Sequence, residues 1–375
     1  MKICHVTSAH RNDDPRIFQK ECKTLAAKGY QVFFVAPGES FIKNGVKVVG
    51  IKKKNFKGFL GKIERVLFYS KKIEKVARSL NCDVYHFHDP DMLKTAIRIS
   101  KTGKKVIFDF HENYYDSILK NERTSIPKFV RKLTAKVYRR LELKACKRIY
   151  GCIVVNPEMM NIWKSKSNNI LQITNFPLLT KCPVINDKKN NIIIFAGKNP
   201  MNYSQETFVK AMSFNPNIKY QIYGDISKEN KNNLFSLSPN NIEFKGVVPF
   251  DKMYQAICQA DIGMAVTSMF SEGDKNEGSI GNTKLFEYMM LGVPVICSDY
   301  VSWKKIVEGN ECGICVNPND ISAIKAAINT ILADKDLADK MGKNGRKAIE
   351  EKYNWSNDAE KLLSFYQRIE NEIGE

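Results

Sequence analysis

The sequence predicts an α/β protein of two doubly wound domains, each a parallel sheet with helices on both faces. Apolar strand-like runs alternate with helical periods along the whole chain, a pattern typical of such sheets. The length of 375 residues is too great for one ordinary domain and suits two. A polar segment with two prolines, at 177–191, interrupts the alternation and is interpreted as the linker. We therefore predict domains at 1–180 and 181–355, followed by a C-terminal helix at 356–375.

Short apolar runs predict the strands of the first domain, and apolar residues at helical spacing predict its helices. The first helix has Asp14 as a favourable N-cap and Pro15 as its first helical residue. The strands are expected at 3–6, 32–36, 46–51, 84–88, 106–110 and 152–155, and the helices near 15–28, 61–80, 91–101 and 127–148.

The second domain repeats this alternation after the linker. Ligands of open parallel sheets bind beyond the carboxyl ends of the strands, so the loops there, in the cleft between two such domains, are expected to form the site. Strands are expected at 192–196, 220–223, 242–244, 262–266, 295–298 and 314–316, and helices near 204–212, 252–260, 283–291 and 321–332.

Positive charge is concentrated in the first half of the chain. The sequence has 59 Lys and Arg against 40 Asp and Glu, a net charge of +19. Residues 1–185 carry a net charge of +22, whereas residues 186–375 carry −3. This asymmetry indicates a polyanionic partner for the first half, either nucleic acid or an anionic membrane surface.

Two segments hold much of this charge. Between Lys52 and Lys75, basic residues alternate with aromatic and aliphatic ones. In the helix at 127–148, a basic row runs beside an apolar row, which is typical of a basic amphipathic helix and favours a membrane surface over a plain solvated face. The basic row is Lys128, Lys132, Lys136, Arg140, Lys144 and Arg148, and the apolar row is Phe129, Leu133, Val137, Leu141 and Ala145.

Membrane-spanning and secreted classes are not indicated. The chain lacks a run of about eighteen apolar residues, and its N-terminus does not read as a secretory signal. The ten cysteines are scattered, and the C-x-x-C spacing of Cys312 and Cys315 has neither a second pair nor a nearby His, so it is a poor zinc signal. We expect a cytoplasmic protein with reduced thiols, peripheral on the inner face of the cell membrane.

A glycine-rich loop leads into a helix within residues 278–291. Free backbone N–H groups and the positive end of the helix dipole form an anion site there, as a diphosphate requires. Lys284 adds a charge in the first turn, and Glu287, one turn later, can accept hydrogen bonds from ribose hydroxyls. An ordinary capped core helix with a surface lysine is the alternative interpretation.

This segment resembles the nucleotide-sugar-binding region of the retaining GT-B glycosyltransferases of family 4. The resemblance covers nearly the whole chain and depends on the order and spacing of several motifs. They are Lys284-Leu-Phe-Glu287-Tyr-Met-Met-Leu-Gly292-Val-Pro294-Val-Ile, the opening helix from Asp13 to Glu21, Phe87-His88-Asp89-Pro90-Asp91, Asp109-Phe-His111-Glu112, Thr174-Asn175-Phe-Pro177, Phe244–Pro249 and Ala260–Gly263.

The resemblance implies a GT-B fold and the transfer of a sugar from a nucleoside diphosphate to a glycan or lipid-linked acceptor, in cell-surface polysaccharide synthesis. It implies that His111 contacts the donor sugar, while Glu112 orients His111 or binds acceptor. Arg16, at a helix start facing the cleft, is expected to bind the acceptor together with His88 and Asp89. Donor binding is assigned to Lys198, Gly224, Val248, Gly281, Asn282, Thr283, Lys284 and Glu287.

Three parts of the chain depart from the family pattern. Ser279 stands where the first Glu of a Glu pair is usual, with Glu277 or Glu272 as substitutes. Lys198 replaces an Arg, and Tyr203 replaces a Lys. In the loop after the first strand, Ser8-Ala9-His10 replaces a glycine pair. The alternatives are therefore a catalytically inactive scaffold of the same fold and a nucleic-acid- or polyanion-binding protein, although specific nucleic-acid binding lacks a recognised reading module.

Metal binding is not expected. His5 and His86 fall inside predicted strands and are expected to be packed. Asp89-Pro90-Asp91 imitates the D-x-D metal motif of a different fold, but here it is expected to cap the helix that starts at Asp91. We therefore expect no obligatory metal or other cofactor, with the nucleotide sugar acting as co-substrate.

Overall fold

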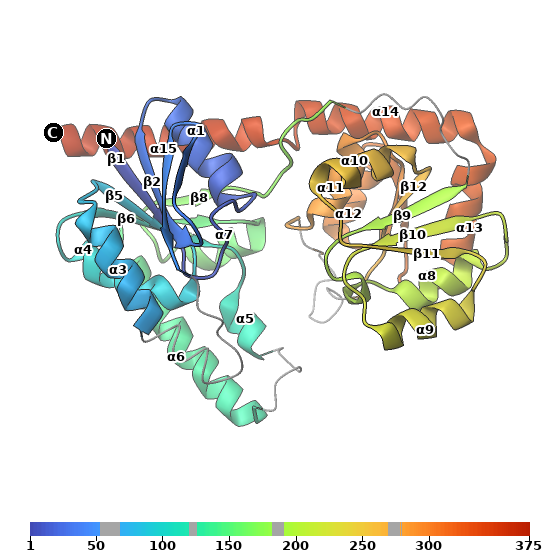
Figure 1. Cartoon of the computed structure of the whole chain (residues 1–375), viewed down its shortest axis with the longest axis horizontal. Coiled ribbons are helices and arrows are strands. Elements are labelled where there is room, and N and C mark those ends of the chain that lie inside the picture. The colour runs from blue at the N-terminus through green and yellow to red at the C-terminus, as the bar shows by residue number, and fades with distance from the viewer. Residues whose placement is uncertain (53–67, 120–125, 182–190, 269–277, 279) are drawn as a thin grey trace. The chain divides into compact units, whose positions relative to one another are not determined.

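The computed structural model describes residues 1–52, 68–119, 126–181, 191–268, 278 and 280–375 of the chain (Figure 1). Contacts divide the chain into two α/β units: residues 1–175 together with 356–375, and residues 176–355. Each unit contains one twisted sheet covered by helices.

The first unit contains an eight-stranded sheet in the order β3-β4-β2-β1-β5-β6-β7-β8, parallel except for β3, which runs antiparallel to β4. The chain extends the sheet from β1 to β2 and β4, and then restarts on the other side of β1 with β5. Ligands bind at such a change of direction, so the loops after β1 and β5 become the candidate position. The elements are β1 (Lys2–Val6), η1 (Ile17–Cys22), α1 (Lys23–Ala27), β2 (Gln31–Pro37), β3 (Phe41–Lys43), β4 (Val46–Ile51), α3 (Ser70–Ser79), β5 (Val84–Phe87), η3 (Pro90–Met92), α4 (Leu93–Ser100), β6 (Lys105–Phe110), α5 (Tyr114–Leu119), α6 (Lys128–Cys146), β7 (Gly151–Val154), α7 (Pro157–Trp163), β8 (Ile170–Gln172) and α15 (Trp355–Gly374).

The second unit contains a six-stranded sheet in the order β11-β10-β9-β12-β13-β14, with every pair parallel. Here the change of direction lies between β9 and β12. The elements are β9 (Ile192–Ala196), η4 (Pro200–Asn202), α8 (Gln205–Met212), β10 (Lys219–Tyr223), α9 (Lys228–Leu237), β11 (Ile242–Gly246), α10 (Phe250–Gln259), β12 (Ile262–Ala265), α11 (Thr283–Met290), β13 (Val295–Ser298), α12 (Val301–Val307), β14 (Gly313–Val316), α13 (Ile321–Ala333) and α14 (Lys335–Glu351).

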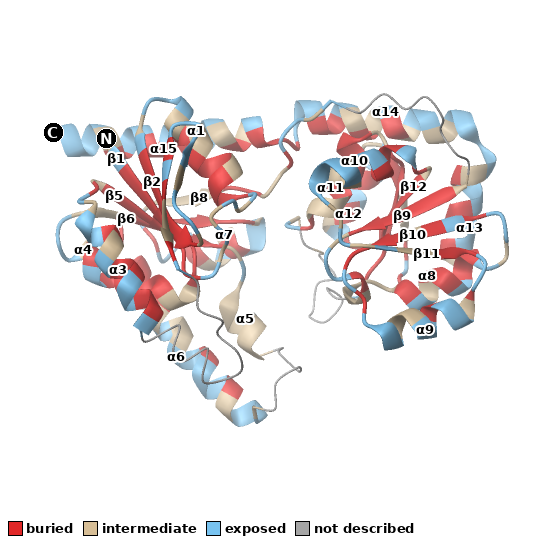
Figure 2. Ribbon diagram, viewed as in Figure 1, coloured by how far each residue is buried: buried red, intermediate tan, exposed pale blue. Residues whose placement is uncertain are grey.

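All twelve predicted strands are present, and the described part of the chain contains two further short strands that the prediction missed. The predicted strands are apolar because helices cover both faces of a parallel sheet; every residue of β9, for example, is buried. Figure 2 shows the same contrast, with buried sheets and helices that expose their outer sides. The missed strands β3 and β8 have three residues each and no fully buried residue, so they give no apolar run to detect.

The predicted helix at 15–28 is irregular: a π-helical turn, η1, precedes the short helix α1. Asp14 Oδ1 accepts hydrogen bonds from the backbone N–H groups of Arg16 and Ile17, each at 2.9 Å. The expected capping by Asp14 is therefore confirmed.

The C-terminal helix α15 packs on the first unit. Leu362, Phe365, Tyr366 and Ile369 are at most 1% exposed, and their spacing of three and four residues makes one apolar face. The Tyr366 hydroxyl lies 2.9 Å from His86 Nδ1. No helix among the described residues is long and apolar enough to cross a membrane.

Candidate active site

In the second unit, the N-terminus of α11 lies at the change of direction of the sheet. Asn282 is its N-cap, and Asn282 Oδ1 accepts a hydrogen bond from the Lys284 N–H at 3.3 Å. The other amide atom, Asn282 Nδ2, is buried without a hydrogen-bond partner in the described part of the chain. An unused side-chain donor beside the free N–H groups of a helix start is suited to an anion.

Lys284 crosses directly over Gly197 at the end of β9. A Cβ atom on Gly197 would lie 2.0 Å from Lys284 Cε, so any side chain at position 197 would displace the end of the lysine. Lys284 Nζ lies 4.7 Å from the ring centroid of Tyr203 and 5.5 Å from that of Phe195. These two aromatic faces hold the ammonium group at the carboxyl end of β9. Tyr203, which departs from the family pattern, thus contacts the lysine that the sequence assigned to the donor.

Gly224 allows the loops after β9 and β10 to touch. Its φ angle is +140°, and a Cβ atom there would lie 2.0 Å from the Gly197 carbonyl oxygen and 2.7 Å from Pro200 Cγ. Gly224 is buried, so its contribution is close approach of the backbone. Lys198 is exposed in the same loop, where its carbonyl accepts a hydrogen bond from the Asp225 N–H at 2.9 Å.

The other donor assignments lie around the same helix start or in the loop after β11. Gly281 is exposed, and Thr283 and Glu287 are half-buried. Val248, in the loop after β11, is partly buried and packs against the core. Ser279 and its potential substitutes Glu272 and Glu277 lie outside the described residues.

In the first unit, the Asp89 carboxylate joins the loops after β1 and β5. It accepts hydrogen bonds from the Thr7 hydroxyl, from the Ser8 N–H at 2.6 Å and from the Ala9 N–H at 3.2 Å. Asp89 occupies the N-cap position of η3, but its side chain makes no capping hydrogen bond. The expected capping role is therefore wrong, because three donors converge on the carboxylate from the β1 loop. Since Asp89 is 2% exposed, its assignment to the acceptor is not supported either.

Arg16 is also turned inward, contrary to the expectation that it faces the ligand. It is 5% exposed, and its Nε and Nη2 donate to Asp109 Oδ2 at 3.0 and 2.9 Å. Nη1 donates to the Ile173 carbonyl at 3.1 Å, and Nε lies 3.2 Å from Glu21 Oε1. Two buried carboxylates require a buried cation, and Arg16 is that cation.

His111 lies at the carboxyl end of β6 and remains partly accessible, with 16% of its side chain exposed. Its Nε2 lies 3.3 Å from Asp109 Oδ2 and 3.2 Å from Nδ1 of the buried His88. Burial raises the pKa of Asp109, but Arg16 and His111 outweigh burial and hold that pKa well below its usual range. Burial is the main reason that the pKa of His88 falls to about 4. An ionised, buried carboxylate therefore orients His111.

Sequence reasoning did not assign a role to Asp109. The available signal was the spacing of Asp109 and His111, because residues two apart lie on the same face of a strand. Glu112 does not perform the orienting role expected of it: its exposed carboxylate accepts a hydrogen bond from Ser117 Oγ at 3.0 Å. His88, expected to bind acceptor, is wholly buried beneath His111.

His10 is a second residue that sequence reasoning left without a role. It follows β1, and its ring centroid lies 5.0 Å from that of His111. His10 Nδ1 lies 3.1 Å from Asp14 Oδ2, and Nε2 lies 3.5 Å from Asp89 Oδ1. Burial lowers the pKa of His10, but the hydrogen bond to Asp14 and the nearby carboxylates raise it overall. With 31% of its side chain exposed, His10 adds an accessible imidazole beside His111.

Comparisons with known proteins agree with this arrangement. Residues 16–170 match the family model "Glycosyltransferase Family 4", and residues 183–348 match "Glycosyl transferases group 1". Together with the two units built on largely parallel sheets, these matches define a GT-B glycosyltransferase. The chain belongs to glycosyltransferase family 4.

Individual relatives are distant but extend over most of the chain. The phosphatidyl-myo-inositol mannosyltransferase of Mycobacterium leprae is 20% identical over 358 residues, which cover 92% of this chain and 90% of that protein. Among solved structures, sucrose-phosphate synthase from Thermosynechococcus elongatus has a TM-score of 0.77 at 17% identity, covering 98% of this chain and 99% of that one. Anabaena HepE in complex with UDP has a TM-score of 0.65 at 13% identity, with coverages of 98% and 99%. These structural likenesses show the shared fold.

Proposed function

We propose that the enzyme transfers a sugar from a nucleoside diphosphate sugar to a glycan or lipid-linked acceptor, with retention of configuration, in the synthesis of cell-surface polysaccharide. The start of α11 is the observation that best supports a nucleoside diphosphate donor. There Lys284 and Asn282 Nδ2, which has no hydrogen-bond partner in the described residues, lie beside the backbone N–H groups of the first helical turn. HepE was solved with UDP, and the M. leprae relative is named for a lipid substrate, which supports the two partner classes. A screen of nucleotide sugars for transfer or slow hydrolysis tests the proposal and identifies base and sugar.

In this mechanism the second unit stabilises the leaving diphosphate. Lys284, Lys198 and the helix start supply positive charge where negative charge develops, and such preorganised charge is a major source of catalysis. His111 contacts the reacting sugar, and the acceptor proton passes to a donor phosphate oxygen, so a separate protein base is not required. We also propose that the diphosphate binds without a divalent cation, because the lysines and helix start neutralise it.

The Lys284→Met variant is expected to bind nucleoside diphosphate 10- to 100-fold more weakly, because it keeps the aliphatic stem over Gly197 and loses the charge. This loss corresponds to about 1.5–3 kcal/mol for one charged hydrogen bond. Calorimetry with UDP and GDP in the presence of EDTA measures the affinity without divalent cations. Glu287→Gln is expected to weaken binding through the ribose contact.

Lys305→Met is the matched control, because Lys305 is an exposed lysine of α12 in the same unit. Unchanged affinity in Lys284→Met and Glu287→Gln would show that the donor site is misplaced. If the unaltered protein binds no nucleoside diphosphate at all, the inactive-scaffold alternative is favoured.

We propose further that α6 binds the surface of an anionic membrane. The side of α6 that packs on the unit includes Arg131, which is 8% exposed. At about 100° per residue, Phe129, Leu133 and Val137 lie on the opposite side of the helix. These three apolar residues are 74%, 63% and 56% exposed.

Basic residues flank this exposed apolar row. Lys132, Lys136 and Arg140 are exposed on the same side of α6. A surface groove at the end of the helix continues the basic region and is lined by Arg140, Leu143, Lys144, Lys147 and Arg148. Apolar side chains that enter the headgroup boundary, with cations around them, are the pattern of interfacial helices. The positive charge of Lys132, Lys136 and Arg140 favours a surface of anionic lipid over a neutral one.

Changing Lys132, Lys136 and Arg140 together to Gln is expected to weaken binding to phosphatidylglycerol-containing liposomes by about 100-fold. The estimate assumes about 1 kcal/mol for each basic residue at an anionic surface. Cosedimentation measures binding, which should also fall steeply with salt. Transfer to a short soluble acceptor should be retained.

The matched control removes the same charge from the second unit, by changing Lys335, Lys343 and Lys347 of α14 to Gln; these residues are exposed. Equal sedimentation of the unaltered protein and the α6 variant would identify α6 as an ordinary solvated surface.

A further inference from the structure

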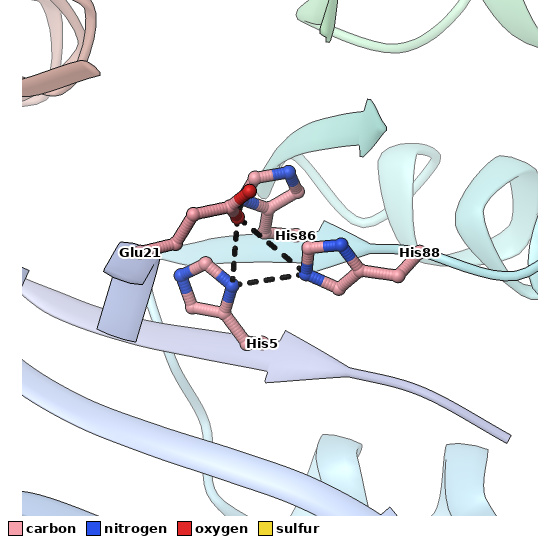
Figure 3. Close-up of side chains that lie close together, drawn as sticks. All are labelled: His5, Glu21, His86 and His88. Atoms are coloured by element: carbon pink, nitrogen blue, oxygen red, sulfur yellow. Dashed lines mark hydrogen bonds and ion pairs between the residues drawn. The ribbon is translucent and has the colours of Figure 1, made fainter. Parts of the chain in front are cut away.

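Three histidines and one glutamate meet inside the first unit (Figure 3). His5 lies on β1, His86 on β5 and His88 directly after β5, while Glu21 comes from η1. His5 and His86 are register partners in the parallel pair β1–β5, and His86 and His88 are two residues apart, so the three rings share one face of the sheet. All four residues are fully buried, with exposures of 0%.

The donor atoms of the four side chains converge on one point. His5 Nδ1 lies 3.0 Å from His88 Nε2, and Glu21 Oε2 lies 3.8 Å from His5 Nδ1. The same oxygen lies 3.8 Å from His86 Nδ1 and 4.0 Å from His88 Nε2. All four donor atoms lie within 4.8 Å of one another. Tetrahedral bonds of 2.0–2.1 Å place ligand atoms roughly 3.4 Å apart, so displacements of less than about 1 Å would close the set on one ion.

Hydrogen bonds within the protein leave this cluster incomplete. Both Glu21 oxygens are buried at the point of convergence and have no hydrogen-bond partner in the residues described. The Oε1 atom of Glu21 does face Arg16 Nε at 3.2 Å, as an ion pair. Buried polar atoms without hydrogen bonds are rare and frequently indicate an ion or water that completes the site.

We propose that His5, Glu21, His86 and His88 bind one divalent transition-metal ion, with zinc as the best fit. Three imidazoles and one carboxylate form a donor set that zinc accepts, and four protein ligands in a closed site are typical of a structural zinc. The Tyr366 hydroxyl, which now shares His86 Nδ1 at 2.9 Å, releases that nitrogen to the ion.

The proposed ion would act on the position of His111 through His88. While Nε2 of His88 binds the ion, its Nδ1 faces His111 Nε2 at 3.2 Å and Asp109 Oδ2 at 3.6 Å. A metal-bound histidine whose other nitrogen meets a carboxylate is a recurrent arrangement that fixes the ring orientation. All four proposed ligands lie in the first unit, whereas donor binding is proposed for the second. The metal site can therefore be tested independently of the proposed transfer reaction.

The test measures zinc per chain by mass spectrometry of digested protein, using the untagged full-length chain expressed in zinc-supplemented medium and gel-filtered. We expect one zinc ion per chain in the unaltered protein and loss of most of it in His5→Gln and Glu21→Gln. Two controls should keep the ion: Tyr366→Phe, which removes only the neighbouring hydroxyl, and His111→Gln. The second control separates this site from the adjacent trio His88, Asp109 and His111, which could also hold a metal.

Three outcomes overturn the proposal: a metal-free unaltered protein, full zinc content in both His5→Gln and Glu21→Gln, or loss of zinc in His111→Gln. Circular dichroism identifies variants that fail to fold. If the variants fail to fold, the site can still be tested in the unaltered protein, expressed with cobalt in place of zinc. Its visible spectrum should then show the strong d–d absorption of a four-coordinate cobalt ion. A spectrum without this absorption counts against the site.

Discussion

The His111→Ala variant is expected to transfer sugar about 10²–10³-fold more slowly than the unaltered enzyme, because it removes a preorganised polar group from the proposed reacting centre. The ring of His111 is partly accessible at the carboxyl end of β6 and is held by the buried Asp109 carboxylate at 3.3 Å. Affinity for the nucleoside diphosphate should change little, because diphosphate binding is assigned to the second unit. Initial rates with the donor found in the screen give kcat and KM, and calorimetry gives the affinity.

Glu112→Ala is the control for this experiment, since its exposed carboxylate bonds to Ser117 and lies in the same loop. Its kcat should fall much less than that of His111→Ala. A normal kcat for His111→Ala would remove His111 from the mechanism. An equal loss of kcat and diphosphate affinity would indicate that the variant disturbs the fold.

The Gly224→Ala variant is expected to lose about 3–5 kcal/mol of unfolding free energy, through backbone strain and steric overlap together. At a φ of +140° a side chain is strained in any case, and its Cβ atom would lie 2.0 Å from the Gly197 carbonyl oxygen. Urea unfolding followed by tryptophan fluorescence measures the loss. Because the displaced loop also carries Lys198, diphosphate binding should weaken in the same variant.

The Gly246→Ala variant distinguishes the cost of backbone strain from the cost of steric overlap. Gly246 lies in the same unit with a φ of +70°, and a Cβ atom there would meet nothing within 4 Å. We expect this variant to lose only about 1 kcal/mol. Equal losses at both positions would mean that backbone conformation alone, and not contact between the loops after β9 and β10, accounts for the glycine at position 224.

Features that depend on local pattern could be predicted from the sequence. Central strands such as β9 and β12 are apolar over their whole length because both faces of each sheet are covered, and this produces short apolar runs that can be recognised in the sequence. Helix α11 was predictable because its cap, its first-turn lysine and its glycine-rich approach are contiguous within residues 278–291. Burial of His5 and His86 followed from their places inside apolar runs.

Features that depend on which partners meet required the tertiary structure. Arg16 lies at a helix start, and its side chain was expected to be exposed. Instead it is buried, because it pairs with the carboxylates of Asp109, which is distant in sequence, and Glu21, which is five residues away. Asp89 also differs from its expected role: its carboxylate accepts hydrogen bonds from backbone N–H groups of the loop after β1 and does not cap the helix that follows it. In both cases a buried charge takes the partner that compensates it best, and sequence spacing does not encode that choice.

Two helices show the same difference between what periodicity predicts and what packing decides. The amphipathic period of α6 could be read from the sequence, but only packing shows that Phe129, Leu133 and Val137 remain exposed. The helical pattern of α15 could be read from the sequence. Its position beside His86 could not, because it depends on a contact between His86 and Tyr366, which are 280 residues apart. Periodicity determines which face of an element is apolar, and the strand order of the sheet decides what that face meets. The cluster of His5, Glu21, His86 and His88 therefore exists only because β1 and β5 are neighbours and η1 covers them.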